Sequence, residues 1–254
     1  MCSLLKLLWN VYFWLVFVIL TVTGLFLLPV VLLLIVFIRK CSPDGALRRA
    51  IRLYGWILTR VVPFGAPVEV EYKSGERLPS TAIFVANHNS AIDPYLFGTI
   101  PVENGFVTSW PFRIPVYGFF MRLAGYADAR KGWDSVREKC IKLLNAGCSV
   151  TIWPEGHRSC DFQLGRFKNG AFSLSVDTGR PIVPVCILGS GSVLPPGHML
   201  MTPGRVRLIV LDPVYPECGG GDRGEAVRNL RRRIRGMLEA ELSENKHFRI
   251  HAVG

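Results

Sequence analysis

The sequence has no charged residue between Val11 and Ile38. A helix formed by this run would be about 42 Å long, whereas the hydrocarbon core of a bilayer is roughly 30 Å thick. No small-residue cleavage pattern follows the run, so we do not expect a signal peptide. We therefore predict that residues 1–40 are a membrane-embedded helical segment.

Two geometries are compatible with this segment, because Thr21, Gly24 and Pro29 weaken its middle. It is either one tilted spanning helix or a broken, re-entrant pair of shorter helices, and the breakers slightly favour the pair. Several Lys and Arg residues follow at once, which predicts that the remainder of the chain lies on the cytoplasmic side, at the inner membrane in a bacterium. These residues are Arg39, Lys40, Arg48, Arg49, Arg52 and Arg60.

Cysteine pairs and acidic residues are also scarce. The seven cysteines form no CxxC pair and no Cys/His group with zinc spacing, so we expect reduced thiols and no metal site. Nineteen Asp and Glu against 30 Lys and Arg give a formal charge of +11, which favours an anionic partner. A nucleic acid is not expected to be that partner, because a membrane segment is present and no recognisable RNA- or DNA-binding module is.

The rest of the chain is predicted to form two further units. Residues 41–62 carry apolar groups at helical spacing with arginines between them, which indicates either an amphipathic helix at the membrane surface or a helix packed on the next domain. Residues 63–254 alternate short apolar runs with helical patterns, which predicts a cytoplasmic α/β domain, a sheet flanked by helices. The expected strands are residues 68–72, 81–87, 105–109, 149–154, 181–189 and 205–213.

Two helices of this domain are predicted by their periodicity. Residues 133–147 have apolar side chains on one face and a glycine at the end. Residues 225–245 include five arginines opposite an apolar face, and for these a solvated surface is favoured over a membrane contact.

A histidine and an aspartate five residues later, His88 and Asp93, lie in ANHNSAID at the end of an apolar strand. Such a pair is weak evidence alone, and Asp93 before Pro94 also fits a helix N-cap. However, ligand sites of open α/β sheets lie where strands end. We therefore interpret His88 as a base whose other ring nitrogen is held protonated by Asp93.

Basic turns recur at the ends of other expected strands. WPEGHRS contains Glu155, Gly156 and Arg158, LGRFKNG contains Lys168, and GYADARKG contains Arg130. For Glu155 and Arg158 a surface ion pair is the simpler interpretation, and a lone arginine would be solvated. Their recurrence at strand ends indicates a phosphate site.

The order and spacing of these blocks resemble the 1-acylglycerol-3-phosphate acyltransferases and related glycerolipid acyltransferases, from about residue 60 to 215. His88, Ser90 and Asp93 match the NHxSxxD-like block, and Gly125 with Arg130 is similar to the second block. The PEGTRS-like block is matched except that His157 stands where threonine is usual. Phe167, Lys168 and Gly170 resemble the motif that follows, and Val183, Pro184 and Val185 resemble the fourth block.

The resemblance implies a glycerolipid-acyltransferase fold that moves a fatty acyl group from acyl-CoA or acyl carrier protein to a lysophospholipid hydroxyl. No cofactor beyond these co-substrates is implied, and the membrane lipids supply the acceptor. His88 would be the general base oriented by Asp93. The substrate-binding residues would be Gly125, Arg130, Glu155, Gly156, Arg158 and Lys168.

Two departures from the family pattern bear on the acceptor, namely His157 and the small or charged residues 127–129. Another lysophospholipid or a lyso-aminolipid therefore stays open as acceptor, as does a non-catalytic protein that binds anionic lipids. The sequence contains no GxSxG elbow, and none is needed when the thioester itself carries a good leaving group. It leaves the oligomeric state open.

Overall fold

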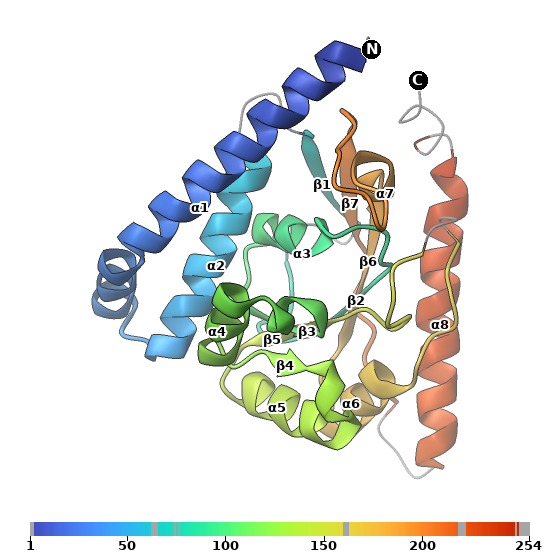
Figure 1. The fold of residues 1–254 in the computed structure, drawn as a ribbon. Helices are drawn as coiled ribbons and strands as arrows, with labels where there is room; N and C mark the ends of the chain where they lie inside the picture. Colours follow the sequence, from blue (N-terminus) through green and yellow to red (C-terminus); the bar gives the residue numbers. More distant parts are fainter. Residues whose placement is uncertain are drawn as a thin grey trace.

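The fold is a sheet flanked by helices, preceded by two long helices (Figure 1). The computed structural model describes residues 3–61, 66–73, 75, 77–159, 163–217, 222–246 and 248. The first two helices are α1 (Ser3–Arg39) and α2 (Pro43–Arg60). The other α-helices of the described residues are α3 (Asp93–Leu96), α4 (Pro115–Leu123), α5 (Trp133–Asn145), α6 (Gly170–Thr178), α7 (Ser190–Val193) and α8 (Arg223–Glu244).

Within the described residues the sheet has seven strands in the order β1-β7-β6-β2-β5-β3-β4. All neighbouring strands pair in parallel except β6 and β7, which are antiparallel. The α/β prediction is thereby confirmed, and each of the six expected strands has a counterpart. The strands are β1 (Val68–Tyr72), β2 (Ile83–Ala86), β3 (Asn104–Thr108), β4 (Ala127–Asp128), β5 (Ser149–Ile152), β6 (Ile182–Leu188) and β7 (Val206–Val210).

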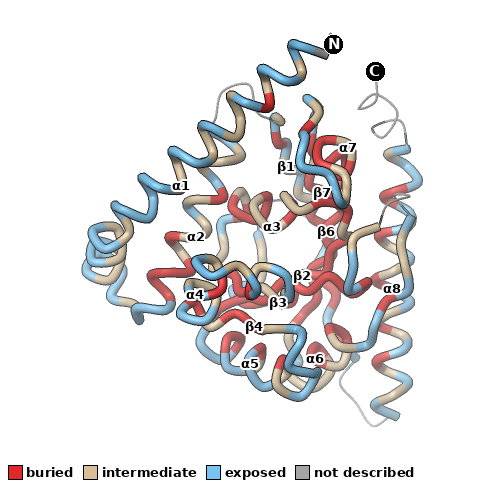
Figure 2. The backbone as a smooth tube through the Cα atoms, viewed as in Figure 1, coloured by how far each residue is buried: buried red, intermediate tan, exposed pale blue. Residues whose placement is uncertain are grey.

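The central strands are covered on both faces, which is why their sequences are continuously apolar rather than alternating. Ile83 and Val85 of β2 pack in the cluster that contains residues of α5, α6 and α8. Phe84 and Ala86 point to the opposite face, where α3 and α7 lie. Figure 2 shows burial concentrated in these strands.

Helix α1 is one continuous helix with a bend, and the choice between a tilted spanning helix and a re-entrant pair in the membrane stays a prediction. Its hydrogen-bonded structure runs from Ser3 to Arg39 with Pro29 inside, and Figure 1 shows that it changes direction before it reaches α2. Proline removes one backbone donor and kinks a helix without having to end it. The segment is thus a single bent helix, and within the described residues it is the one helix long and apolar enough to cross a membrane.

The polar residues of α1 dock it onto the α/β domain. The Asn10 amide donates to the carbonyl of Met201 at 3.0 Å and its Oδ1 accepts from the Met201 N–H at 2.7 Å. The Trp14 indole donates to the carbonyl of Met199, and the Thr21 and Tyr54 hydroxyls are 2.5 Å apart. Spacings of four and seven residues put all three polar groups on one helical face. That face is turned toward the domain and α2.

Helix α2 packs on the domain, as the second of the two alternatives for residues 41–62 predicted. Arg48 is buried and its guanidinium bonds Glu103, Asp44 and the carbonyl of Ala124. Contact with a membrane surface stays a prediction for this helix, and Val62 lies outside the described residues.

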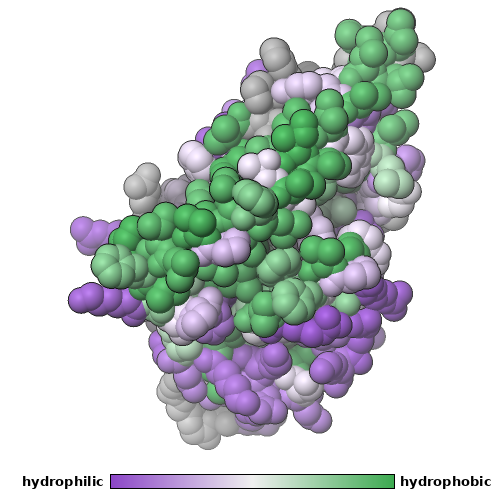
Figure 3. Space-filling model, turned by 60° about the vertical axis from the view of Figure 1, so that its left-hand side comes forward, coloured by the Kyte–Doolittle hydropathy of each residue, from purple (hydrophilic) through white to green (hydrophobic). Residues whose placement is uncertain are grey.

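The outward surface of α1 is apolar. Figure 3 shows a hydrophobic band running along this helix, with hydrophilic residues gathered below it. Large apolar side chains are also exposed on two other helices, namely Trp56 in α2 and Val116 and Phe119 in α4. An exposed apolar band along a whole helix is unusual for a protein surrounded by water and fits a membrane-contacting face.

Candidate active site

His88 and Asp93 meet just beyond the carboxyl end of β2. Nδ1 of His88 lies 2.8 Å from Oδ2 of Asp93. The same oxygen accepts bonds from the backbone N–H groups of Asn89 and Ser90 at 2.9 and 3.0 Å. Asp93 is fully buried, whereas 18% of the His88 side chain is exposed. A carboxylate acceptor at Nδ1 favours the tautomer with the proton there, which leaves Nε2 as the basic nitrogen.

This geometry also shows that Asp93 does not act as the helix cap of α3. Helix α3 starts at Asp93 with Pro94 in its first turn, but its N-cap residue is Ile92, which makes no side-chain cap bond. The Asp93 carboxylate instead turns back to residues 88–90. Its position at a helix start is compatible with its contact to His88, because both follow from the tight loop after β2.

Trp153, which the motif analysis did not single out, covers one face of the His88 ring. The two ring centroids are 4.7 Å apart at an interplanar angle of 28°, so the rings are stacked. Trp153 is 7% exposed and also stacks on Phe106. Because this indole is buried and packed against other rings, it restricts the orientation of the imidazole. The available sequence signal was an aromatic residue at the end of β5, the strand that pairs with β2.

Glu155 lies beneath His88 and its two carboxylate oxygens bind backbone. Oε1 accepts from the His88 N–H at 3.2 Å, and Oε2 accepts from the Gly165 N–H at 2.8 Å. Burial raises the pKa of Glu155, while the Gly165 and His88 N–H groups lower it less strongly. Ser159 adds a backbone bond to the carbonyl of His88 at 2.8 Å. The two motif blocks around His88 and Glu155 are therefore joined directly.

A cationic group of residues lies next to this pair. Gly156, Arg158 and Lys168 line the same cavity as His88, and His157 lines it as well. Gly156 has φ +76°, and a Cβ there would lie 2.6 Å from Nζ of Lys168. The absence of a side chain at Gly156 thus allows the lysine to cross the turn.

Gly125 and Arg130 take different positions from the other predicted binding residues. Arg130 follows β4 at the same edge of the sheet, but its guanidinium is paired with Asp128, with Nη2 and Oδ2 2.6 Å apart. Its neighbour Ala129 lines the cavity. Gly125 forms a turn with φ +72°, and its missing Cβ would face Nη1 of Arg48 at 3.7 Å. The structure therefore assigns Gly125 to the turn after α4, where the positive φ requires glycine.

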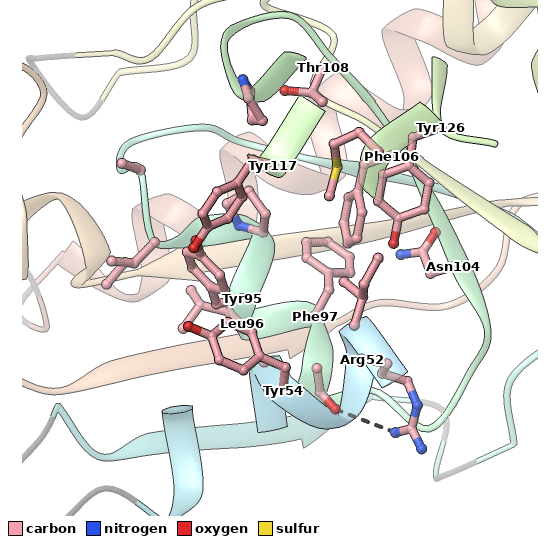
Figure 4. Close-up of a pocket in the computed structure, with 18 of the residues that line it drawn as sticks. Arg52, Tyr54, Tyr95, Leu96, Phe97, Asn104, Phe106, Thr108, Tyr117 and Tyr126 are labelled. Carbon is pink, nitrogen blue, oxygen red and sulfur yellow. Dashed lines mark hydrogen bonds between the residues drawn. The ribbon is translucent and has the colours of Figure 1, made fainter. Parts of the chain in front are cut away.

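The cavity in front of His88 is large and mostly apolar. Its volume is about 1390 Å³, above the roughly 300–1,000 Å³ of common small-molecule pockets. It passes between α1, α2, α3 and α4, and Figure 4 shows Tyr54, Tyr95 and Tyr117 with their hydroxyls turned toward one another on one side. Phe97, Phe106 and Tyr126 form another part of the wall (Figure 4). Among the described residues no group of His, Cys, Asp or Glu is arranged to hold a metal ion.

Comparison with known proteins shows which proteins the chain resembles. Residues 69–188 match the family model described as Acyltransferase. The chain is 34% identical over 170 residues to a chloroplastic 1-acyl-sn-glycerol-3-phosphate acyltransferase of Brassica napus, covering 63% of this chain and 48% of that protein. Over these residues the chain is therefore similar to acyltransferases.

Other acyltransferases show how far the similarity extends. A 1-acyl-sn-glycerol-3-phosphate acyltransferase of Escherichia coli (strain K12) is 27% identical over 200 residues, 75% of this chain and 79% of that protein. The chain spans about half the length of the curated plant relatives it matches. The crystal structure of the 1-acyl-sn-glycerophosphate acyltransferase PlsC from Thermotoga maritima superposes with a TM-score of 0.68 at 23% identity, covering 94% of this chain and 97% of that one. The overall fold is thus shared with that protein.

Proposed function

We propose that this protein is a membrane-bound 1-acylglycerol-3-phosphate O-acyltransferase. It would transfer a fatty acyl group from acyl-CoA or acyl carrier protein to the sn-2 hydroxyl of 1-acylglycerol-3-phosphate, which gives phosphatidic acid. The observation that carries the proposal is the His88–Asp93 pair, whose basic nitrogen belongs to a side chain lining a large apolar cavity beside Arg158 and Lys168. The names of the relatives at 27–34% identity support this choice of acceptor.

In the proposed reaction, Nε2 of His88 removes the proton of the acceptor hydroxyl while its oxygen attacks the thioester carbon. Asp93 stabilises the imidazolium that results. Collapse of the tetrahedral intermediate breaks the carbon–sulfur bond, and the departing thiolate takes the proton from His88. No enzyme nucleophile is required, because a thiolate is already a good leaving group.

The cations would bind the acceptor phosphate. Arg158 and Lys168 line the cavity with His88 and are the first candidates. Arg130 joins them when the phosphate replaces Asp128 as its partner, since both anions use the same guanidinium edge. Glu155 and Gly156 act through the backbone, because the Glu155 oxygens hold the His88 and Gly165 N–H groups and Gly156 leaves room for Lys168.

The apolar surface of α1 would place the cavity at the membrane, where lysolipid and acyl chains partition. The basic residues after Ile38 favour a cytoplasmic position for the acyltransferase domain. This arrangement brings a water-soluble thioester donor and a membrane-held acceptor to the same cavity.

The decisive experiment is an acyl-transfer assay in mixed micelles with purified protein, acyl-CoA or acyl carrier protein as donor, and a panel of lysolipids. Transfer to lysophosphatidic acid that is lost in His88→Ala supports the proposal. Transfer only to a different lysolipid would show that the acceptor is not lysophosphatidic acid. His157, which stands where threonine is usual, would then be the first residue to test. Lipid binding without any transfer would identify a non-catalytic lipid-binding protein instead.

A further inference from the structure

Two arginines of α8 contact the acyltransferase site through an intervening loop. Arg231 and Arg235 lie one helical turn apart, and both reach residues 163–169, which precede α6. Arg235 donates to the carbonyl of Leu164 at 3.0 Å and also to that of Gly165. Arg231 donates to Oδ1 of Asn169. These two arginines remain partly exposed, but each also makes a specific contact with the loop.

Arg235 is also held from a second direction. Its guanidinium carbon lies 5.2 Å from the centre of the Phe167 ring, and its Nε is 2.8 Å from Oε1 of Glu239. Phe167 is 3% exposed and stacks on Phe172 of α6. A guanidinium fixed by two carbonyls, a ring and a carboxylate has little freedom, so it fixes the loop as well.

The loop transmits this anchoring to Glu155. The Leu164 carbonyl and the Gly165 N–H belong to the same peptide bond; the carbonyl accepts from Arg235, and the N–H donates to Oε2 of Glu155. A cationic donor at the oxygen of a peptide polarises its N–H and strengthens the bond on the other side. Oε1 of Glu155 then accepts from the N–H of His88. Three consecutive hydrogen bonds thus connect α8 to the backbone of His88.

A second branch of the loop reaches the cationic side of the cavity. The N–H of Lys168 donates to the carbonyl of Pro154 at 2.9 Å, and the Lys168 side chain crosses Gly156. Asn169, which Arg231 holds, lines the cavity next to Lys168. Arg231 is therefore placed to control the position of Lys168 rather than that of His88.

We propose that Arg231 and Arg235 are positioning residues for acyl transfer, Arg235 acting on His88 through Glu155 and Arg231 acting on the acceptor-binding cations through Asn169. This inference rests on the proposed acyltransferase function. It assigns α8 a part in the reaction although α8 lies on the side of the sheet opposite α1 (Figure 1).

The two branches predict different kinetic effects. Arg235→Ala should lower kcat by roughly 10-fold or more, because small displacements of a catalytic base are costly, with little change in the KM of the acceptor. Arg231→Ala should chiefly raise the KM of the phosphate-bearing acceptor. Arg235→Lys should recover only part of kcat, because an ammonium group lacks the planar fork that holds two carbonyls.

A pH profile separates positioning from simple loss of stability. Burial raises the pKa of Glu155 and the Gly165 N–H opposes that rise; the titratable groups facing Glu155 are His88 and His157. Weakening the Gly165 bond in Arg235→Ala should raise this pKa further. The acidic limb of kcat should then move to higher pH, because the carboxylate must be ionised to accept both N–H groups.

The experiment compares these variants with Arg233→Ala, which removes an exposed arginine of the same helix, and includes Arg235→Ala in a Glu155→Gln background. Full-length proteins are assayed in micelles and their thermal unfolding is recorded. A double variant no slower than Glu155→Gln alone supports the path, since residues that act through one another are non-additive. Fully additive losses, or an Arg235→Ala variant that keeps the kcat and the pH profile of Arg233→Ala, would overturn it. Absence of transfer by the wild-type protein would instead contradict the proposed function itself.

Discussion

Oδ2 of Asp93 accepts three hydrogen bonds at once, from Nδ1 of His88 and from the backbone N–H groups of Asn89 and Ser90. A single oxygen thereby fixes both the imidazole and the loop that carries it. The other oxygen of this buried carboxylate, Oδ1, has no hydrogen-bond partner among the described residues. The side-chain hydrogen bonds of Asp93 thus all go to His88 and to the loop that carries it.

Asp93→Asn is expected to reduce kcat for acyl transfer by roughly 10²–10⁴-fold, because a neutral amide stabilises the imidazolium poorly and permits the wrong tautomer. The amide nitrogen would also occupy the unpartnered Oδ1 position, which should lower the free energy of unfolding by about 1–3 kcal/mol. Initial rates in micelles and thermal unfolding measure the two effects. A folded variant with wild-type kcat would contradict the assignment of His88 as a base oriented by Asp93.

Glu155 should make stability depend on pH in a defined direction. Burial raises the folded-state pKa of Glu155 above its usual value of 4.5, so folding favours the protonated carboxyl group. The resulting contribution to stability is fully present below pH 4.5. This contribution is lost as pH rises through the folded-state pKa. The stability of wild type relative to Glu155→Gln should therefore decline from acid toward neutral pH. Thermal unfolding of both proteins over a pH series measures this difference, and an increase with pH would mean that the carboxylate is stabilised rather than desolvated.

Gly156→Ala should affect both stability and acceptor binding. The positive φ costs about 1–2 kcal/mol for a residue with a Cβ, and the added methyl would displace the Lys168 ammonium. Gly147→Ala is the matched control, because Gly147 has φ +78° and nothing lies within 4 Å of its missing Cβ. Both variants should lose similar stability, but only Gly156→Ala should raise the KM for the phosphate-bearing acceptor. Equal KM values for the two variants would show that Lys168 does not take part in acceptor binding.

Asn10→Leu should loosen the docking of α1. The substitution leaves the N–H and carbonyl of Met201 without their partner in a buried place, which costs about 1–3 kcal/mol. Thr23→Ala, at an exposed position of the same helix, should be close to neutral. Hydrogen exchange of the Met201 amide in micelles gives the local measurement. Unchanged protection in Asn10→Leu would show that α1 is held by other contacts.

Much of the fold could be predicted because its signals are local. The apolar strands and the helix over residues 133–147 follow from periodicity, and the positions of His88, Glu155 and Arg158 follow from their places at strand ends. Strands β2 and β5 are parallel neighbours, so whatever follows them meets at one edge. Their adjacency could not be predicted from periodicity alone.

The remaining features depend on contacts between distant segments or on side-chain direction. No pattern in α8 indicates that Arg235 reaches Leu164, since a solvated arginine has the same sequence signature. The stacking of Trp153 on His88 likewise needs the strand order. Arg130 is different, because its partner Asp128 is two residues away and the pairing could have been considered. In α1, Pro29 indicated a disturbance but did not determine whether the helix would end or bend.

The placement of α1 has a practical consequence for anyone who prepares this protein. Phe13, Phe17, Leu20 and Leu28 of this helix form part of the cavity wall, while its outer side chains are apolar. Removing the helix to obtain a detergent-free protein would open the cavity on this side and expose its apolar interior to water. A shortened protein should therefore precipitate or lose turnover rather than behave as an isolated catalytic unit.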